Sequence, residues 1–186
     1  MTATNLNPDL ALYGAPGVGK STAAGYLADV HAYRRVSVAG YHPGGVRDVA
    51  VRVWGSGADQ DRPKLNALMK LRDFDPDVWM RNYRREVVRQ RQLKRSLVTD
   101  DFRGDNEWQL GHELGIVFIH LVADDAERFR RLERTGKLEG SGHPFLYVLE
   151  DTIRYHPDYV VDANATQAEV AEALVDIINI ERRKRS

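Results

Sequence analysis

The stretch from Asp9 to Thr22, DLALYGAPGVGKST, decides the fold of this chain of 186 residues. Its first part, Leu10 to Tyr13, is a short apolar run that predicts a buried strand. The run stops at GAPGVGKS, residues 14–21, which fits the pattern G-x-x-x-x-G-K-[ST] at every fixed position. A helical pattern follows directly. A strand, a glycine loop and a helix in this order predict a loop that binds phosphate groups.

The residue types of this loop suit a nucleoside triphosphate. Glycines let the chain curl so that successive backbone N–H groups point inward, and the helix start near Lys20 adds the positive end of its dipole. Lys20 is predicted to reach the β- and γ-phosphates of ATP, and the Ser21 hydroxyl to bind Mg²⁺. The predicted ATP-binding residues are Gly14, Ala15, Pro16, Gly17, Val18, Gly19, Lys20, Ser21 and Thr22. A glycine-rich turn that binds nothing is the alternative, but such a turn has no need of Gly-Lys-Ser in that order.

Composition limits the classes of protein to consider. Hydrophobic residues make up 42% of the chain and charged residues 29%, which suits one α/β domain over residues 1–186. Lys and Arg number 27 and so do Asp and Glu, and zero net charge argues against binding to a nucleic acid polymer. The absence of Cys excludes disulfides and thiolate catalysis. No apolar run approaches the length of a membrane span and the first residues show no signal pattern, so we expect a cytoplasmic protein without membrane contact.

Strand-like and helical segments alternate along the chain. Apolar runs predict four further strands, at residues 34–39, 96–99, 116–122 and 159–161. This alternation predicts a three-layer α/β/α fold in which a parallel sheet of about five strands has helices on both faces. Ligands of such sheets lie beyond the carboxyl ends of the strands. Asp100 and Asp101 follow the third strand there, where a carboxylate can hold Mg²⁺ through water, facing Ser21; capping a turn is the alternative role.

A predicted helix at residues 126–134 is dense in arginine. Arg130 or Arg131 lies on one helical face with Arg134, beside the glycine-rich segment 135–142. Planar guanidinium groups suit the charge on a transferring phosphoryl group. We therefore predict that Arg131 and Arg134 act with Lys20 in catalysis; the alternative is a solvated basic face.

Further motifs lie between these elements. Arg62-Pro63-Lys64-Leu65 opens a helical segment, and DPDVW at 75–79 ends in Trp79. DFRGDNE at 101–107 contains Arg103 and Glu107, and DYVVDANAT spans 158–166. With the glycine loop, these motifs resemble those of the deoxynucleoside monophosphate kinases of bacteriophages, relatives of adenylate kinase within the P-loop kinases. The resemblance covers nearly the whole chain.

The resemblance implies transfer of the γ-phosphoryl group of ATP to a deoxynucleoside monophosphate (dNMP), which gives ADP and a deoxynucleoside diphosphate. It implies a single P-loop domain with a small lid at about 128–143 and an acceptor-binding segment at about 40–80. It places the catalytic, metal-binding aspartate on Asp101, and the acceptor on Arg62, Trp79, Arg103 and Glu107. It also implies a homodimer, and the host cytoplasm if a phage encodes the protein.

The residues leave two other functions open. One is a P-loop kinase for another small acceptor, such as a sugar, shikimate or a nucleic-acid end. The other is a nucleotide-sensing module that uses the loop as a switch. Gly40-Tyr41 stands where the family commonly has Asp-Pro, so the sequence does not settle which base is accepted.

Overall fold

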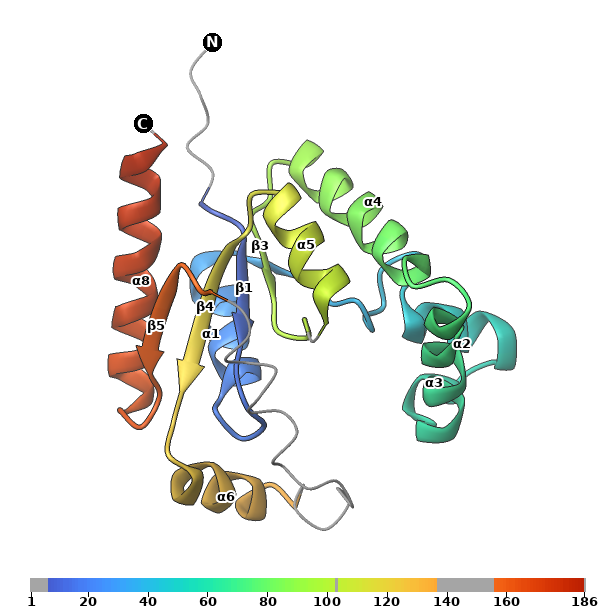
Figure 1. The fold of residues 1–186 in the computed structure, drawn as a ribbon, viewed down its shortest axis with the longest axis horizontal. Coiled ribbons are helices and arrows are strands. Elements are labelled where there is room, and N and C mark those ends of the chain that lie inside the picture. The colour runs from blue at the N-terminus through green and yellow to red at the C-terminus, as the bar shows by residue number, and fades with distance from the viewer. Residues whose placement is uncertain (1–6, 103, 137–155, 186) are drawn as a thin grey trace.

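A computed structural model describes residues 7–102, 104–136 and 156–185 of the chain. Its centre is a five-stranded sheet in the order β2-β3-β1-β4-β5, and every neighbouring pair of strands is parallel (Figure 1). The strands are β1 (Leu10–Tyr13), β2 (Arg34–Arg35), β3 (Leu97–Thr99), β4 (Val117–Val122) and β5 (Tyr159–Asp162). The predicted parallel sheet of about five strands is confirmed.

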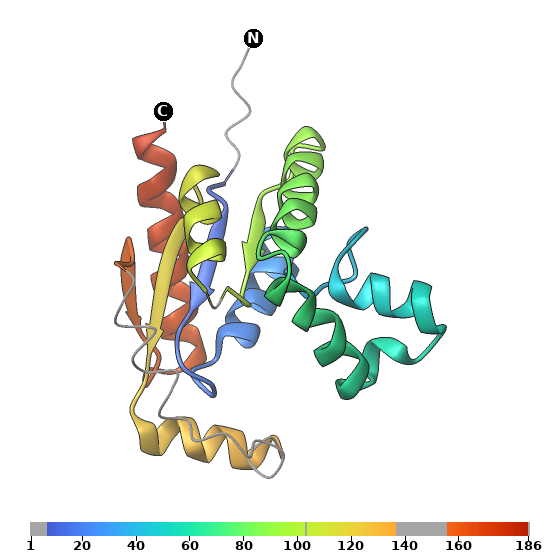
Figure 2. The ribbon, with the colours of Figure 1, turned by 45° about the vertical axis from the view of Figure 1, so that its right-hand side comes forward.

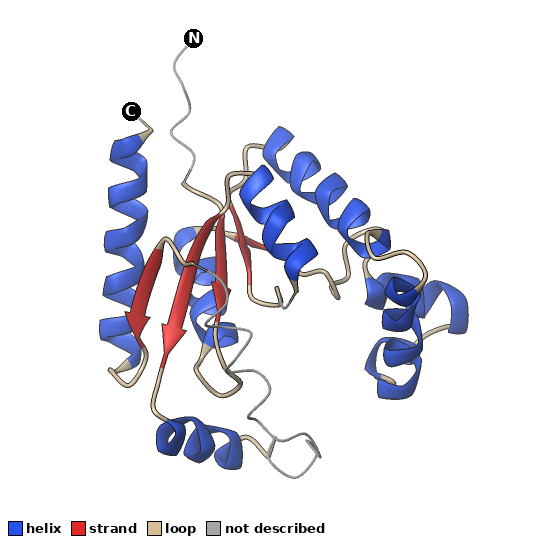
Figure 3. Cartoon of the chain, in the orientation of Figure 1, coloured by secondary structure: helices blue, strands red, loops and turns tan. Residues whose placement is uncertain are grey.

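Helices cover both faces of this sheet, as Figures 1 and 2 show, so the three-layer prediction is also confirmed. α1 and α8 pack on one face, and α4 and α5 lie on the other. α2 and α3 form a lobe to one side, and α6 lies beyond the carboxyl ends of the strands (Figure 3). The helices are α1 (Lys20–His31), α2 (Val46–Trp54), α3 (Arg62–Met69), α4 (Val78–Gln92), α5 (Asp105–Glu113), α6 (Asp125–Arg134) and α8 (Gln167–Lys184), with 3₁₀ turns at Ala58–Gln60 and Lys70–Asp73.

The alternation of side chains along the strands builds two cores. Leu10 and Leu12 of β1 point to the face that α1 and α8 cover, while Ala11 and Tyr13 point to the face of α4 and α5. Because both faces are covered, all four residues of β1 are buried. A strand buried on both sides holds the loop that follows it in a fixed place.

β2 is shorter than predicted, because the sequence pattern extended this strand to residue 39. The N–H of Val36 still donates to the Val98 carbonyl at 3.0 Å. The N–H groups of Val38 and Ala39 donate instead to the two carboxylate oxygens of Asp101, at 3.1 and 3.0 Å. A side chain therefore replaces the strand ladder, and the chain turns away from the sheet.

Local residues mark two helix ends. The Thr166 hydroxyl accepts from the Glu169 N–H and the Glu169 carboxylate accepts from the Thr166 N–H, which forms a capping box at the start of α8. Gly115 ends α5 with a φ of 63°, in the left-handed region. Residues 137–143 of the predicted lid and the predicted acceptor residue Arg103 lie outside the described residues. None of the described helices is long and apolar enough to cross a membrane.

Candidate nucleotide-binding site

The loop between β1 and α1 is held by its glycines against the elements around it. Gly14, Gly17 and Gly19 have φ values of 137°, 82° and 102°, which residues with a side chain rarely adopt. A Cβ on Gly14 would overlap the Leu121 carbonyl oxygen, and one on Gly17 would lie 2.6 Å from the carbonyl oxygen of Arg128. The loop therefore fits closely between β4 and α6, and α1 begins at its end with Lys20.

Lys20 and Ser21, the first residues of α1, contact the glycine loop and the end of β3. The Lys20 ammonium donates to the carbonyl oxygens of Gly14 and Ala15, at 2.6 and 3.1 Å, so it lies curled over the loop. The Ser21 hydroxyl donates to Asp100 Oδ2 at 2.8 Å. A hydroxyl from the loop and a carboxylate from the end of β3 thus meet across the sheet edge.

Asp100 occupies the position in which the sequence reasoning put Asp101. Asp100 Oδ2 also accepts from Arg35 at 2.9 Å, and its side chain is 10% exposed. Asp101 points the other way, because successive side chains after a strand face opposite sides, and binds Val38, Ala39 and the Thr99 hydroxyl. Burial raises the pKa of Asp101 above its usual value, and the hydrogen bonds from the backbone lower it in part. The expected contact between Asp101 and Ser21 is therefore not made, and Asp100 contacts Ser21 instead.

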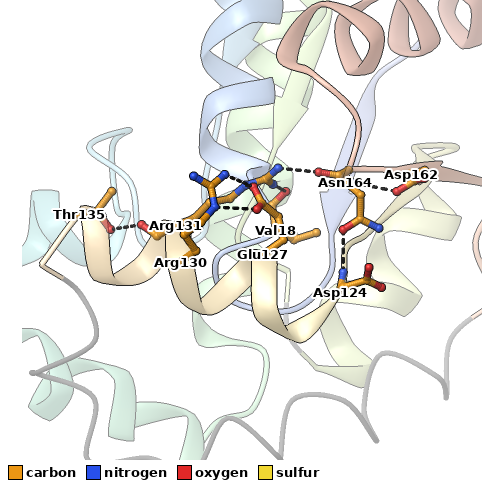
Figure 4. A network of polar contacts seen from close by, with 9 residues as sticks. Val18, Asp124, Glu127, Arg130, Arg131, Thr135, Asp162 and Asn164 are labelled. Atoms are coloured by element: carbon orange, nitrogen blue, oxygen red, sulfur yellow. Dashed lines mark hydrogen bonds and ion pairs between the residues drawn. The ribbon is translucent and has the colours of Figure 1, made fainter.

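The arginines of α6 divide into anchored and open groups. Arg128 is 2% exposed and donates to the Pro16 carbonyl at 3.2 Å and to Asp125. Arg131 donates to the Val18 carbonyl at 3.3 Å and to the Ala163 carbonyl at 2.7 Å, so it ties α6 to the loop and to the segment after β5 (Figure 4). Both guanidinium groups donate hydrogen bonds to backbone carbonyl oxygens, including those of Pro16 and Val18. These bonds hold the loop at residues 14–21 in place.

Arg130 and Arg134 differ in what holds them. Arg130 makes a bidentate pair with the Glu127 carboxylate, at 2.7 and 2.8 Å (Figure 4). Arg131 adds a third bond to Glu127 at 2.6 Å, and these hydrogen bonds, with that from Arg130 contributing most, lower the pKa of Glu127 to about 2. Within residues 7–102, 104–136 and 156–185, Arg134 makes no hydrogen bond or ion pair. Arg134 nevertheless lines the same cavity as Arg130 and Arg131.

One cavity of about 920 Å³ unites these groups. Gly14, Pro16 to Thr22, Asp100, Arg131 and Arg134 all line it, whereas the predicted loop residue Ala15 does not. The segment 163–167 after β5 also lines it, and the sequence reasoning did not assign that segment to the site. The signal for this segment was its position directly after β5, because ligands of parallel sheets lie beyond the carboxyl ends of the strands. The Asn164 side chain accepts from the Asp124 N–H at 2.9 Å and so joins this segment to the start of α6.

The residues suit magnesium. Kinase sites hold Mg²⁺ through one or two carboxylates and the substrate phosphates rather than in an all-protein cage. In the part of the chain that the structure describes, no group of three or more His, Asp or Glu side chains gathers into such a cage. Ser21 with Asp100 is the set that fits a Mg²⁺ carried by a nucleotide.

Comparison with known proteins supports the fold. A deoxyadenosine kinase from M. mycoides with bound dATP matches with a TM-score of 0.53 at 15% identity, over 92% of this chain and 99% of that one. Shikimate kinase from Acinetobacter baumannii matches with a TM-score of 0.52 at 13% identity, over 96% and 94%. A sugar kinase from Janibacter sp. matches with a TM-score of 0.53 at 16% identity, over 95% and 97%. The chain has the fold of the P-loop kinases. No protein-family model and no curated protein matches the sequence.

The predicted acceptor residues do not gather at this cavity. Trp79 is 4% exposed in the core under α4, and its indole N–H has no hydrogen-bond partner among the described residues. Glu107 is buried on α5, with Arg72 at 3.8 Å, and Arg62 is exposed on α3. None of these three lines the cavity. Arg103 lies outside the described residues.

An aromatic wall, which the sequence reasoning missed, lies at the β1 end of the cavity instead. Tyr13, Phe102 and Trp108 line it. Tyr13 meets Trp108 edge-on at 5.2 Å between ring centroids and stacks on His120 at 4.6 Å. Burial, with a smaller effect from Lys20, lowers the pKa of His120, so this ring stays neutral beside the loop at pH 7. The three rings come from β1, the turn after β3, and α5, and no local sequence pattern links such positions.

Proposed function

We propose that this protein transfers the γ-phosphoryl group of ATP to a deoxynucleoside monophosphate and releases ADP and a deoxynucleoside diphosphate. The observation that carries the proposal is that Lys20, the Ser21–Asp100 pair and the open Arg134 line one cavity of about 920 Å³. That volume lies in the upper part of the usual range for ligand sites, which leaves space for an acceptor beside the nucleotide. A passive nucleotide-binding module has no need of an arginine such as Arg134, which lines the cavity and is paired with none of the described residues.

Each residue then has a role in positioning and charge neutralisation, which is most of phosphoryl-transfer catalysis. The N–H groups of residues 17–21 hold the phosphates, and Lys20 leaves its carbonyl partners to follow the charge of the γ-phosphoryl group. Ser21 and Asp100 hold the Mg²⁺ of the nucleotide, which neutralises phosphate charge when bound. Arg134 adds a guanidinium at the departing phosphoryl group. Arg128 and Arg131 act as positioning residues, because their donors are used on the loop and on the segment after β5.

The aromatic wall supports a nucleoside acceptor. Trp108 is the half-buried ring of the three, because Tyr13 and Phe102 are 5% and 9% exposed, and stacking of a base on an aromatic side chain is worth about 1–3 kcal/mol. Sugars and shikimate are acceptors of two proteins with the same fold, and such polyols need several hydrogen-bonding groups more than they need a stacking surface. From the resemblance, Arg103 remains our proposed ligand of the acceptor phosphate. Arg62 reaches the acceptor only if the lobe of α2 and α3 moves toward the sheet, because α3 lies outside the cavity lining.

A coupled assay of ADP release over a panel of acceptors tests the proposal. The panel holds dNMPs, ribonucleoside monophosphates, sugars and shikimate. We expect stimulation by one or more dNMPs, and loss of that stimulation in Lys20→Ala with an unchanged melting temperature. Lys64→Ala is the matched control, because Lys64 pairs with Asp61 at the start of α3 and does not line the cavity.

The other outcomes have definite meanings. Stimulation by a sugar or by shikimate alone would identify another small acceptor. Tight ATP binding with no response to any acceptor would identify a nucleotide-sensing module. Near-normal turnover of Lys20→Ala would refute the site itself. The homodimer stays a prediction, which analytical ultracentrifugation of the full chain measures directly.

A further inference from the structure

Polar contacts, rather than an apolar face, fix the position of α6. Of the ten residues of this helix only Arg128 and Leu132 are buried, so a single buried apolar side chain anchors it. Packing of an apolar face normally determines where a helix lies on a protein. A helix with so small an apolar contact depends on its hydrogen bonds for its position.

These hydrogen bonds reach α6 at two places. Arg128 and Arg131, in the middle and second half of the helix, donate to carbonyl oxygens of the loop at residues 14–21. The start of the helix is held from a different element. There Asn164 Oδ1 accepts from the N–H of the N-cap residue Asp124 at 2.9 Å (Figure 4).

The segment that carries Asn164 is itself fixed to the sheet. The Asn164 N–H donates to the Asp162 carboxylate at 2.8 Å, and the Ala163 N–H donates to the Val122 carbonyl oxygen at 2.7 Å. The Ala163 carbonyl oxygen also accepts from Arg131 at 2.7 Å. Asn164 is therefore a fixed point at the carboxyl ends of β4 and β5, against which the start of α6 rests.

Arg134 lies at the opposite end of this helix. A helix of ten residues is about 15 Å long, and Arg134 is the last of them. The contacts of Arg128 and Arg131 lie between the two ends, so a tilt that lifts the first turn also displaces the last one. A misplacement of about 1 Å at a reacting centre can cost about 10²-fold in rate.

We propose that Asn164 is a positioning residue for phosphoryl transfer, and that it sets the place of Arg134 through its hydrogen bond to the start of α6. The inference rests on the proposed kinase function and on the role of Arg134 in it. Loss of the Asn164 bond should therefore lower kcat and leave the KM for ATP nearly unchanged. Asn164 also lines the cavity, so direct contact with the nucleotide is the alternative, and loss of such a contact would raise the KM instead.

Three variants test the hydrogen bond. Asn164→Ala removes the acceptor and should lower kcat by about ten-fold, less than the full cost of a 1 Å misplacement because the arginine contacts remain. Asn164→Asp keeps an acceptor oxygen at a helix N-terminus, where negative charge is favourable, and should recover part of the loss. Ser96→Ala is the matched control, because it also removes one bond from a side chain to a distant backbone carbonyl, that of Asn7, at the opposite edge of the sheet. It should leave kcat at the wild-type value.

A double-mutant cycle with Arg134→Gln tests whether Asn164 acts through Arg134. We expect Arg134→Gln to lower kcat by a smaller factor in Asn164→Ala than in wild type, because the guanidinium is already misplaced there. The same factor in both backgrounds would overturn the proposal. A raised KM for ATP with unchanged kcat in Asn164→Ala would overturn it as well, because Asn164 would then contact the nucleotide.

Hydrogen exchange of the amides of Asp125–Arg134 measures the hold on α6 without turnover. Exchange should be faster in Asn164→Ala than in wild type and in Ser96→Ala, since fewer bonds then resist local opening. Equal exchange in all three proteins would overturn the proposal. A wild type that transfers phosphate to no acceptor would refute the proposed function, whereas an active wild type with equal factors in the cycle would refute only the role of Asn164.

Discussion

Asp100 and Asp101 are neighbours in sequence, and the structure predicts opposite consequences for the same substitution at each. Asp100→Asn keeps the shape of the side chain and removes the negative charge beside Ser21. Removing a group that supports a metal from one step away costs about 10–100-fold in metal affinity. Since each ten-fold is about 1.4 kcal/mol, the loss is about 1.4–2.7 kcal/mol of Mg²⁺ binding. The stability of the fold should change little, because the Asp100 side chain holds no backbone group.

Asp101→Asn should instead weaken the fold. Both carboxylate oxygens accept backbone N–H groups, from Val38 and Ala39, and an amide NH₂ would face one of those donors. A lost bond with a buried unsatisfied donor costs about 1–3 kcal/mol. The burial that raises the pKa of Asp101 offsets part of this cost, since the amide carries no charge. For a chain of this size, each kcal/mol lowers the melting temperature by about 2–4 °C.

Two measurements on both variants decide the question. Turnover against Mg²⁺ concentration should shift by about 10–100-fold for Asp100→Asn and remain near wild type for Asp101→Asn. The melting temperature should show the reverse order. A larger Mg²⁺ shift in Asp101→Asn than in Asp100→Asn would refute the assignment, and would return the metal to the aspartate that the family resemblance favours.

Three further predictions concern the loop and α6. Gly17→Ala places a Cβ 2.6 Å from a carbonyl oxygen of α6 and should weaken ATP binding measured by calorimetry, whereas Gly115→Ala, strained by φ alone, should lower only the melting temperature. Arg134→Gln should lower kcat by about 10²–10³-fold, as the loss of one transition-state donor does, with little change in the KM for ATP. Arg130 lines the same cavity but is held by Glu127, so Arg130→Gln should lower kcat much less than Arg134→Gln; an equal loss in both variants would contradict this reading. The pKa of Glu127 is lowered from 4.5 to about 2, so its stabilisation is complete above pH 4.5 and is lost as the pH falls through about 2. The difference in melting temperature between wild type and Glu127→Gln should therefore shrink over that range, and a constant difference would contradict the ion pairing.

Much of the fold follows from local pattern. The alternation of apolar runs with helical segments predicts a parallel sheet, because each crossover needs a helix and each covered strand becomes apolar throughout. The loop at 14–21 carries its own conformation in Gly14, Gly17 and Gly19, whose φ values are positive in the structure. The capping box at Thr166 is equally local. These features rest on contacts within a few residues, which a sequence displays directly.

β2 shows where local pattern is not enough. The sequence of residues 34–39 favours a strand to its end, but two of its N–H groups are bound by a carboxylate 62 and 63 residues away. Trp79 shows the same limit at the site. Its motif suggested an acceptor contact, and only the packing of α4 places it in the core.

The sequence alone determined that a loop of the pattern G-x-x-x-x-G-K-[ST] precedes a helix, that the sheet is parallel, and that aspartates and arginines lie at its carboxyl edge. Tertiary structure decided which of them face the cavity. Asp100 and Asp101 point in opposite directions because of a one-residue step at a strand end. Arg131 is anchored and Arg134 is open because the loop and the segment after β5 contact only part of α6. Such choices depend on which distant backbone groups lie within reach of a side chain, and three-dimensional packing supplies that information.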